Sequence, residues 1–287
     1  MCDTCGCNIT PGNAHLVEGD GPLARTGHGH EAVEVLSGLL SANDHQAMHN
    51  REHFDRHRVL AINLMSSPGA GKTALLEATI EALGGEFSLA VIEGDLETEN
   101  DAERIRAKGV PAVQITTGSA CHLDAHLVHD ALHSMRLDGL DILFIENVGN
   151  LVCPASFDLG HHRNVTLLST TEGDDKPAKY PVMFRSSDLM LLTKADLLPY
   201  LGDFDPARAE RCLRELANDA PAFNLSARNG DGLQAWFDWL RSQLTHHREH
   251  LAHGESSWPR GVTPRRHDHT HTHTHDSEHH HPHHEHA

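Results

Sequence analysis

The residues best suited to chemistry are those of the loop Ser66-Ser67-Pro68-Gly69-Ala70-Gly71-Lys72-Thr73. An apolar run precedes this loop and a helical pattern follows it, which is the arrangement that holds nucleotide phosphates. The backbone N–H groups can surround an anion, Lys72 can reach the β- and γ-phosphates, and the Thr73 hydroxyl can bind Mg²⁺. Ser66 stands where the usual pattern has glycine, and an ordinary glycine turn is the alternative. We predict a phosphate-binding loop formed by Gly69, Ala70, Gly71, Lys72, Thr73 and Ala74.

Acidic residues follow two of the predicted strands on the side that faces this loop. Asp95, with Glu97 as second choice, can bind Mg²⁺ or orient the attacking water. Glu146 can reach the Mg²⁺ shell, and the Gly149 N–H can sense the γ-phosphate. An ordinary loop carboxylate is the alternative for each acid. The predicted catalytic residues are Lys72, Asp95 and Glu146, and the predicted Mg²⁺ ligands are Thr73, Asp95 and Glu146.

The segment Thr193-Lys194-Ala195-Asp196 resembles the Asn-Lys-x-Asp motif that selects guanine in GTPases. The Asp196 carboxylate can accept hydrogen bonds from guanine N1–H and the exocyclic amine, which adenine cannot supply. Thr193 replaces the usual Asn, which puts part of the loop's bracing in doubt. Ser226 and Ala227 resemble the supporting guanine loop, and together these segments favour GTP over ATP.

Two groups of soft ligands could each hold a metal ion. Cys2, Cys5 and Cys7, with the amine exposed if Met1 is removed, suit Ni²⁺ or Zn²⁺. Cys121, His122 and Cys153 follow predicted strands near the nucleotide switch and could share one Zn²⁺ or Ni²⁺. His126 and His129 are outer candidates. A mobile terminus and buried structural cysteines are the respective alternatives.

Histidines form two further patterns. His45, His49, His53 and His57 recur every four residues and share one face of a predicted helix, either as ligands or as a solvated stripe. Eleven of the 21 residues in 267–287 are histidine, so this tail can bind divalent ions but cannot bury a core. An expression tag is the alternative for the tail.

Apolar runs alternate with helix-length amphipathic segments from residue 59 onward, which predicts an α/β P-loop NTPase fold with a mostly parallel sheet covered by helices on both faces. The predicted strands are 59–65, 87–92, 111–116, 141–146, 164–169, 188–193 and 220–225. The predicted helices are 43–57, 72–84, 99–108, 122–136, 206–219 and 232–248. We expect a cysteine motif and flexible linker over 1–42, a GTPase domain over 43–251 and a disordered His-rich tail over 252–287.

The composition excludes some classes of protein. A formal net charge of −18 argues against nucleic-acid binding. No apolar run is long enough for a membrane span, and the N-terminus lacks a signal-peptide pattern. We therefore expect a cytoplasmic protein, in which the cysteines are metal ligands or core residues.

The longer motifs together resemble the hydrogenase nickel-incorporation GTPases (HypB), over essentially residues 1–248. They are Cys2-x-x-Cys5-Gly6-Cys7, the helix around Asn50-Arg51, the phosphate loop, Glu93-Gly94-Asp95, Cys121-His122-Leu123-Asp124-Ala125 and Glu146 to Pro154. The resemblance implies a metallochaperone that hydrolyses GTP while helping to load nickel into the large subunit of [NiFe]-hydrogenase. It also implies nickel at Cys2, Cys5 and Cys7, and a second metal site at Cys121, His122 and Cys153.

The resemblance further implies partners: a GTP-dependent homodimer with the second metal site at its interface, a zinc-binding HypA-type protein and a SlyD-type chaperone. From the layout we expect GTP to draw the second metal group into one arrangement and hydrolysis to release it. Two alternatives stay open. One is a urease-type nickel-loading GTPase, and the other is a nickel storage protein in which GTP hydrolysis is secondary.

Overall fold

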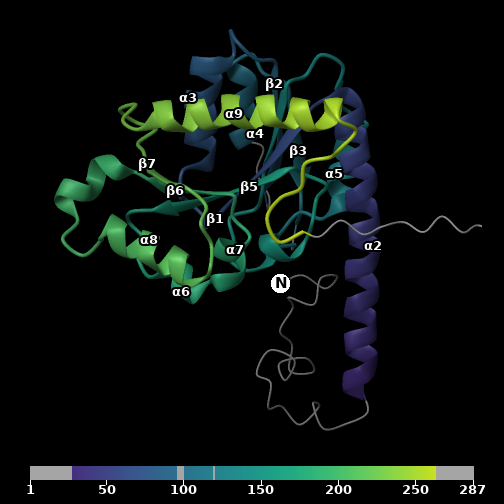
Figure 1. Cartoon of the computed structure of the whole chain (residues 1–287), viewed down its shortest axis with the longest axis horizontal. Coiled ribbons are helices and arrows are strands. Elements are labelled where there is room, and N and C mark those ends of the chain that lie inside the picture. The colour runs from purple at the N-terminus through teal and green to yellow at the C-terminus, as the bar shows by residue number, and fades with distance from the viewer. Residues whose placement is uncertain (1–27, 96–99, 119, 263–287) are drawn as a thin grey trace, which may run out of the picture.

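A seven-stranded parallel sheet is the centre of the molecule (Figure 1). The computed structural model describes residues 28–95, 100–118 and 120–262. The strand order is β3-β2-β4-β1-β5-β6-β7, and every pair is parallel. The strands are β1 (Leu60–Ser66), β2 (Leu89–Asp95), β3 (Ala112–Thr116), β4 (Ile142–Glu146), β5 (Arg163–Ser169), β6 (Leu189–Thr193) and β7 (Ala222–Asn224). The predicted α/β class and parallel sheet are confirmed.

Helices cover both faces of the sheet. They are α2 (His28–His57), α3 (Lys72–Leu83), α4 (Asn100–Ala107), α5 (Ala125–Leu132), α6 (Lys176–Lys179), α7 (Pro181–Arg185), α8 (Pro206–Glu215) and α9 (Leu233–Ala252). Two 3₁₀ segments, η2 (Cys153–Ser156) and η3 (Ala195–Tyr200), follow strands β4 and β6. The sequence prediction did not include α6 and α7, which are short.

Successive residues of β1 enter different hydrophobic clusters, which explains why the strand is apolar throughout. Ile62 packs in the cluster that also contains residues of α3 and α9. Ala61 packs in the opposite cluster, together with Phe54 of α2 and Val128 of α5. A third cluster joins α7 and α8 to the β5–β6 side of the sheet. The carboxyl ends of the central strands are thereby held between helix layers.

Helix α2 begins at His28, well before the predicted boundary at Asn43. Its first half projects away from the α/β body in Figure 1. The sequence predicts a cysteine motif and flexible linker over 1–42, but residues 28–42 contain no proline and only two glycines. Residues 28–42 are helical in the structure, and residues 1–27 lie outside the described residues, so the division of the chain into domains stays a prediction.

The chain also stays ordered beyond Leu251, where we expected the fold to end. The Arg51 guanidinium lies 4.0 Å from the centre of the Trp258 ring, and the Arg260 N–H donates to Asp188 Oδ1 at 3.1 Å. These contacts hold the segment after α9 against the body of the protein. No helix in the described part of the chain has the length and apolarity needed to cross a membrane.

Candidate nucleotide and metal sites

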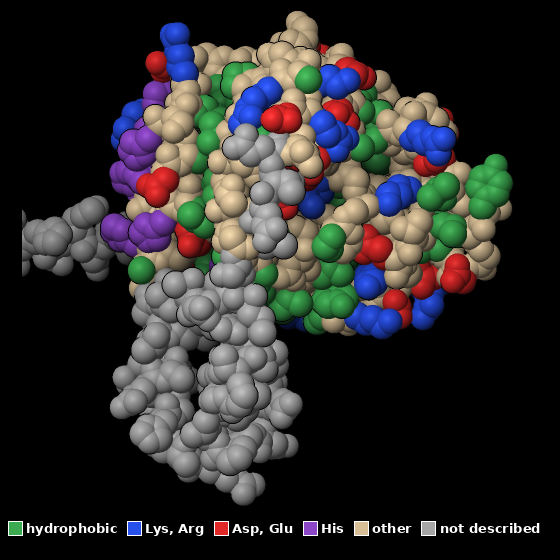
Figure 2. All heavy atoms as spheres, turned by 180° about the vertical axis from the view of Figure 1, so that it is seen from behind, with side chains coloured by type: hydrophobic (Ala, Val, Ile, Leu, Met, Phe, Trp, Pro, Cys, Tyr) green, Lys and Arg blue, Asp and Glu red, His purple; other side chains and the backbone are tan. Residues whose placement is uncertain are grey.

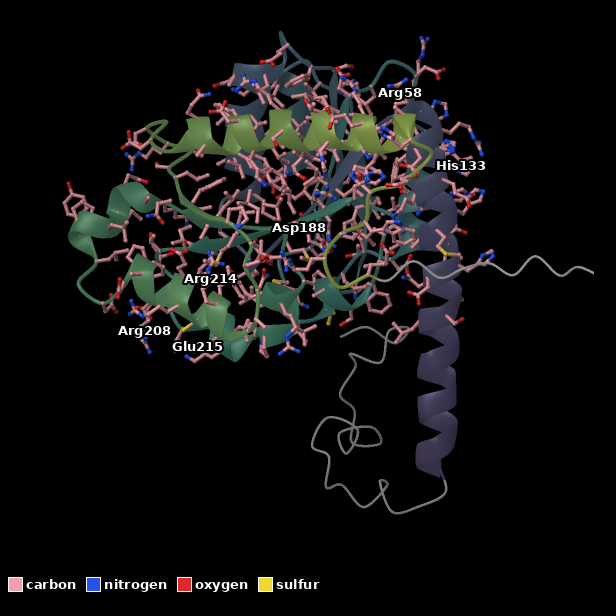
Figure 3. All side chains as sticks on the ribbon, viewed as in Figure 1. Arg58, His133, Asp188, Arg208, Arg214 and Glu215 are labelled. Atoms are coloured by element: carbon pink, nitrogen blue, oxygen red, sulfur yellow. The ribbon has the colours of Figure 1, made fainter. Side chains whose placement is uncertain are left out.

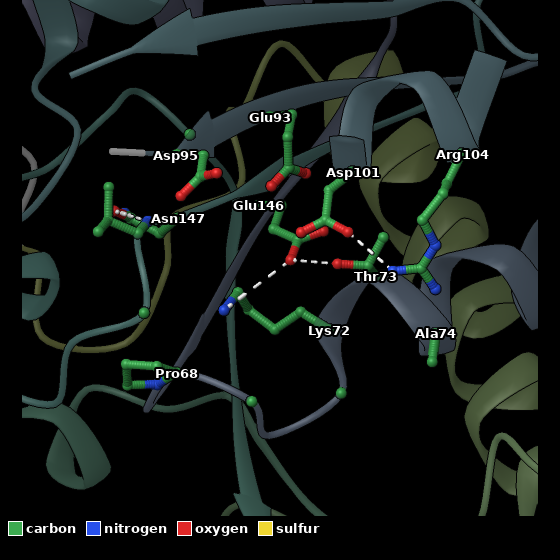
Figure 4. Close-up of a pocket in the computed structure, with 15 residues that line it drawn as sticks. Pro68, Lys72, Thr73, Ala74, Glu93, Asp95, Asp101, Arg104, Glu146 and Asn147 are labelled. Carbon is green, nitrogen blue, oxygen red and sulfur yellow. Dashed lines mark hydrogen bonds and ion pairs between the residues drawn. The ribbon is translucent and has the colours of Figure 1, made fainter. Parts of the chain in front are cut away.

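The phosphate loop joins the end of β1 to the start of α3, as predicted (Figure 4). Gly69 and Gly71 have φ values of 74° and 98°, in the left-handed region that glycine adopts without strain. The Lys72 ammonium donates to Ser66 Oγ at 3.1 Å and lies 3.9 Å from Glu146 Oε1. Ser66, which stands where the usual loop has a glycine, therefore positions the lysine through its hydroxyl group.

Two carboxylates lie side by side across the sheet from this lysine. Strand register pairs Glu93 of β2 with Glu146 of β4, and both side chains are buried. Thr73 donates its hydroxyl hydrogen to Glu146 Oε1 at 3.0 Å. Burial, followed by the charge of Glu146, raises the pKa of Glu93. Burial also raises the pKa of Glu146, against the opposing effect of the Lys72 ammonium.

This pair fits a magnesium ion. One oxygen of each carboxylate, Glu93 Oε2 and Glu146 Oε2, is buried without a hydrogen-bond partner in the structure. Carboxylate and hydroxyl oxygens are the ligands that Mg²⁺ takes in phosphate sites. A cation beside the pair would offset the cost of burying two acids at adjacent positions.

A cavity of about 340 Å³ opens in front of these groups. Asp95 and Gly149, both predicted, line it together with Asp101 and Arg104, which are ion-paired at 2.7 Å. Gly149 lies so close to the phosphate loop that a Cβ there would be 2.7 Å from Pro68 Cα. Glu97, the second choice among the acids, lies outside the described residues.

A second cavity, of about 230 Å³, adjoins the other side of the phosphate loop. The residues that line it include the predicted base-binding set Thr193, Lys194, Asp196, Ser226 and Ala227, together with Ala70 and Ala74. The Thr193 hydroxyl donates to the Ala70 carbonyl at 2.7 Å, so it braces the base loop against the phosphate loop. The Arg228 N–H donates to Ser226 Oγ at 3.2 Å, which shapes the opposite wall.

The predicted thiolate–imidazole group also comes together. Cys121 Sγ lies 3.1 Å from Cys153 Sγ and 3.9 Å from His122 Nδ1. The His122 ring is buried and stacks on Phe157 with ring centres 4.0 Å apart. Burial lowers the pKa of His122, which favours the neutral form that binds metals. Two thiols and one imidazole suit a borderline ion such as Zn²⁺ or Ni²⁺, and a fourth ligand could complete its coordination.

Cys121 and His122 lie in the loop before α5, whereas the sequence predicts a helix that already begins at residue 122. Asp124 caps α5 by accepting from the Leu127 N–H at 2.9 Å, so the helix begins at Ala125. Cys153 lies at the start of η2.

Three contacts connect the metal group to the nucleotide site. Asn147, which follows Glu146, accepts from the Leu123 N–H at 3.1 Å. Asn150 donates to the Cys121 carbonyl at 3.2 Å. Gly94 of β2 approaches Leu123 so closely that a Cβ there would be 2.8 Å from Leu123 Cγ. Both sites therefore contact strand β2 and the segment that follows β4.

Sequence reasoning missed Glu93, Asp101 and Arg104 as cavity residues. In the sequence Glu93 stands out only as part of the motif Glu93-Gly94-Asp95, and no periodicity shows that β2 lies beside β4. Cys2, Cys5 and Cys7, and the tail 267–287, lie outside the described residues.

The comparisons agree with this geometry. The CobW/HypB/UreG nucleotide-binding domain matches residues 60–224. The hydrogenase maturation factor HypB of Azotobacter vinelandii is 51% identical over 237 residues, which cover 81% of this chain and 77% of the relative. HypB of Escherichia coli (strain K12) is 51% identical over 211 residues, covering 74% of this chain and 72% of the relative.

Solved structures give the same result. HypB from Helicobacter pylori in complex with nickel has a TM-score of 0.66 and 38% identity, and the match covers 75% of this chain and 98% of that one. HypB from Archaeoglobus fulgidus has a TM-score of 0.67 and 38% identity, covering 71% of this chain and all of that one. The chain belongs to the CobW/HypB/UreG family of P-loop GTPases and, within it, to the HypB hydrogenase maturation factors.

Proposed function

We propose that this protein is a cytoplasmic metallochaperone that hydrolyses GTP and uses the cycle to help insert nickel into the large subunit of a [NiFe]-hydrogenase. The observation that carries the proposal is the direct connection between the two sites. Asn147 and Asn150, on the loop that follows Glu146, hold the backbone of Leu123 and Cys121. A change at the phosphates can therefore change the geometry of the thiolate–imidazole group.

In the nucleotide site, we assign the β- and γ-phosphates to the backbone of the loop from Gly69 to Ala74 and to the Lys72 ammonium. The Gly149 N–H, beside Pro68, is placed to sense the γ-phosphate. Asp196 accepts from the guanine edge, while Lys194 and the Ser226–Ala227 segment line the base cavity. The sequence shows no arginine finger or catalytic glutamine, so we expect slow turnover.

A magnesium ion would be held by the residues beside the acids of this cavity. Thr73 and Glu146 would hold it, with Asp95 or Glu93 as the further carboxylate. The ion would neutralise charge that develops on the phosphate oxygens. Asp95, half-buried at the end of β2 and lining the cavity, would orient the attacking water.

In the metal site, Cys121, His122 and Cys153 would hold Ni²⁺ or Zn²⁺ through two sulfurs and one imidazole nitrogen. Val152, next to Cys153, is an exposed large hydrophobic residue with 58% of its surface accessible. This exposure supports a GTP-dependent homodimer that closes over the metal group, in which the partner copy completes the coordination. We assign Cys2, Cys5 and Cys7 as the ligands of the nickel ion that the protein later delivers. We expect HypA-type and SlyD-type proteins to assist this delivery.

The test is titration of the full chain with nickel and zinc, in the GDP state and with a non-hydrolysable GTP analogue. We expect metal affinity or stoichiometry to change with nucleotide by about 5- to 150-fold, and the change to disappear in Cys121→Ser. Cys212→Ser is the matched control, because Cys212 is a free, half-buried cysteine on α8. Equal affinity in both nucleotide states would refute the coupling.

A second function has a specific observation in its favour. The relatives from Helicobacter hepaticus and Helicobacter pylori, 44% and 41% identical, are named hydrogenase/urease maturation factors. Activation of urease by this chain in cells that lack their own HypB would show that its client is not limited to hydrogenase. Nickel storage through the tail is the remaining alternative. It predicts that cells with a tail-less chain keep hydrogenase activity but lose tolerance to nickel.

A further inference from the structure

The last turns of α9 carry two histidines whose ring nitrogens meet. His246 and His250 stand four residues apart on this helix, so both side chains project from the same face. Their Nε2 atoms lie 3.2 Å apart, and their ring centres lie 4.5 Å apart. This α9 histidine pair uses none of the residues of the nucleotide site or of the Cys121 group.

The buried residue His247 anchors this part of the helix. Its side chain is fully buried, and its Nε2 lies 3.9 Å from Asp55 Oδ1 on α2. Figure 3 places Arg58, which follows α2, at the same end of α9. The backbone that carries the α9 histidine pair is therefore held by packing against the end of α2.

Two glutamates determine which nitrogen of each ring carries the proton. His250 Nδ1 lies 3.5 Å from Glu255 Oε2, and His246 Nδ1 lies 4.0 Å from Glu249 Oε2. A carboxylate only accepts hydrogen bonds, so each neutral ring is more stable with its proton on Nδ1. The two Nε2 lone pairs then face each other across 3.2 Å, and they repel unless a cation lies between them.

The distance between the nitrogens suits one metal ion. Two nitrogens that bind one ion at about 2.1 Å, with an angle of about 90° to 109° between the bonds, lie roughly 3.0 to 3.4 Å apart. The separation of 3.2 Å falls within that range. Histidines four residues apart on a helix hold zinc in metalloproteases. Metal-bound histidines also commonly have a carboxylate on the other ring nitrogen, as both rings have here.

Histidines are more crowded on another face, but their rings meet differently. Figure 2 shows imidazoles clustered along the α2–α5 edge. The His49 and His129 rings lie 5.2 Å apart with their planes at 75°, and the His129 and His133 rings lie 4.6 Å apart with their planes at 90°. In such edge-to-face contacts the nitrogens do not converge on a common point, so crowding alone does not make a site.

A buried histidine group fails for a different reason. Asp55, His162 and His247 lie close enough together to share an ion. However, His162 Nδ1 accepts from the Ala61 N–H at 2.9 Å, which places the ring proton on Nε2, 3.1 Å from Asp55 Oδ1. That ring has no free lone pair to offer to a metal.

We propose that His246 and His250 form a binding site for a divalent transition metal ion of borderline softness, such as Ni²⁺ or Zn²⁺, with water in the remaining positions. Glu249 and Glu255 orient the two rings through their Nδ1 hydrogens. The proposal does not rest on the nucleotide cycle or on the delivery of nickel to an enzyme.

The experiment measures acylation of each histidine by diethyl pyrocarbonate, read by mass spectrometry on the full chain during nickel titration. Cleavage after arginine places His246 and His250 in separate peptides, 242–248 and 249–260, which also separates them from the tail. We expect nickel to protect both residues at a common midpoint. Magnesium at the same concentration should not protect them, because imidazole is a poor ligand for that ion.

Two variants at exposed positions test the pairing. Loss of an outer partner already costs a metal site about tenfold, so His246→Ala should raise the midpoint for His250 by at least that factor. The double change Thr245→His with His246→Ala keeps the number of histidines but separates the rings by five residues, on different faces of the helix. It should raise the midpoint as much as His246→Ala alone. His126→Ala, at an exposed histidine of α5, is the matched control and should leave both midpoints unchanged.

The opposite results would overturn the proposal. If His250 reacts equally with and without nickel, the contact between the two rings is only a hydrogen bond or a shared proton, and the proposal is wrong. It is also wrong if the midpoint for His250 is the same in the unaltered chain and in the double variant. Failure of this site leaves the Cys121 titration unaffected, so the two proposals are tested separately.

Discussion

The phosphate site and the thiolate–imidazole site lie at the same edge of the sheet, but they are held in place by different means. The phosphate site is built on strand ends. Glu93 and Glu146 are neighbours because β2 pairs with β4 in a fixed register. The metal site is built on loops, and side-chain hydrogen bonds from Asn147 and Asn150 hold one of its two halves.

This difference indicates a direction for the coupling. Moving a strand end requires breaking ladder hydrogen bonds and buried packing on both faces, whereas moving the loop around Cys121 requires breaking only a few polar contacts. The nucleotide should therefore set the shape of the metal site, while the metal changes the phosphate site little in structure. The following predictions test that asymmetry, from the largest expected effect to the smallest.

The largest effect is expected for Lys72→Ala. Removing a charged group that stabilises a transferring phosphoryl should slow GTP hydrolysis by about 10² to 10³. Metal binding without nucleotide should be unchanged, because Lys72 contacts Ser66 and Glu146 and not the metal loop. Single-turnover hydrolysis and a zinc titration measure the two effects. Lys179→Ala, at an exposed lysine paired with Asp175, is the control. A loss of zinc affinity equal to the loss of hydrolysis would contradict the asymmetry.

The next effect concerns pH and the buried acid pair. Because the pKa of Glu93 is raised, this carboxyl keeps its proton near neutral pH in the free protein. Magnesium binding to both carboxylates must release that proton, so affinity should rise with pH by up to about tenfold per unit. Glu93→Gln cannot ionise and should flatten this slope as well as weaken binding.

Magnesium-dependent GTP binding at pH 6, 7 and 8 provides the measurement. Glu103→Gln, at an exposed acid on α4, should keep the slope of the unaltered protein. Identical slopes for Glu93→Gln and the unaltered protein would show that Glu93 keeps its proton when magnesium is bound.

These sites also show what sequence can and cannot predict. The strand Ile142–Glu146 was recognisable because a strand covered on both faces must be apolar throughout. The contact between Glu93 and Glu146 was not, because strand order is a property of the whole sheet. The base-binding loop was predictable from its sequence motif. The role of Thr193 was not predictable, because it depends on the contact of its hydroxyl with the Ala70 carbonyl.

The ends of the fold were hardest to predict for a related reason. Residues 253–262 have a composition that is compatible with a linker, and local signals give no reason to extend the fold into them. The Trp258 ring contacts Arg51, which lies far away in the sequence. A long-range contact of this kind fixes the conformation of a segment whose own sequence has no strong preference for helix or strand.

A smaller effect is expected for Asn147→Ala, which leaves the buried Leu123 N–H without its partner. An unsatisfied buried donor costs about 1 to 3 kcal/mol of stability. The ratio of metal affinities between the GTP-analogue and GDP states should fall toward one, while GTP affinity changes little. Urea unfolding and paired zinc titrations measure both quantities. Asn229→Ala, at an exposed turn residue bonded to Asp231, is the control. Unchanged coupling would mean that Asn150 alone transmits the nucleotide state.

The smallest effect is expected for Thr193→Ala. This residue belongs to the nucleotide site, which is built on strand ends. The change removes one buried hydrogen bond, worth about 0.5 to 1.5 kcal/mol, between the base loop and the Ala70 carbonyl. GTP affinity should fall by roughly two- to tenfold. The phosphate loop is fixed independently by β1 and α3, so affinity for inorganic pyrophosphate should not change. Thr245→Ala, on the exposed face of α9, is the control. If pyrophosphate binding weakens as much as GTP binding, Thr193 supports the phosphate loop itself, and the strand-held site is less rigid than its register implies.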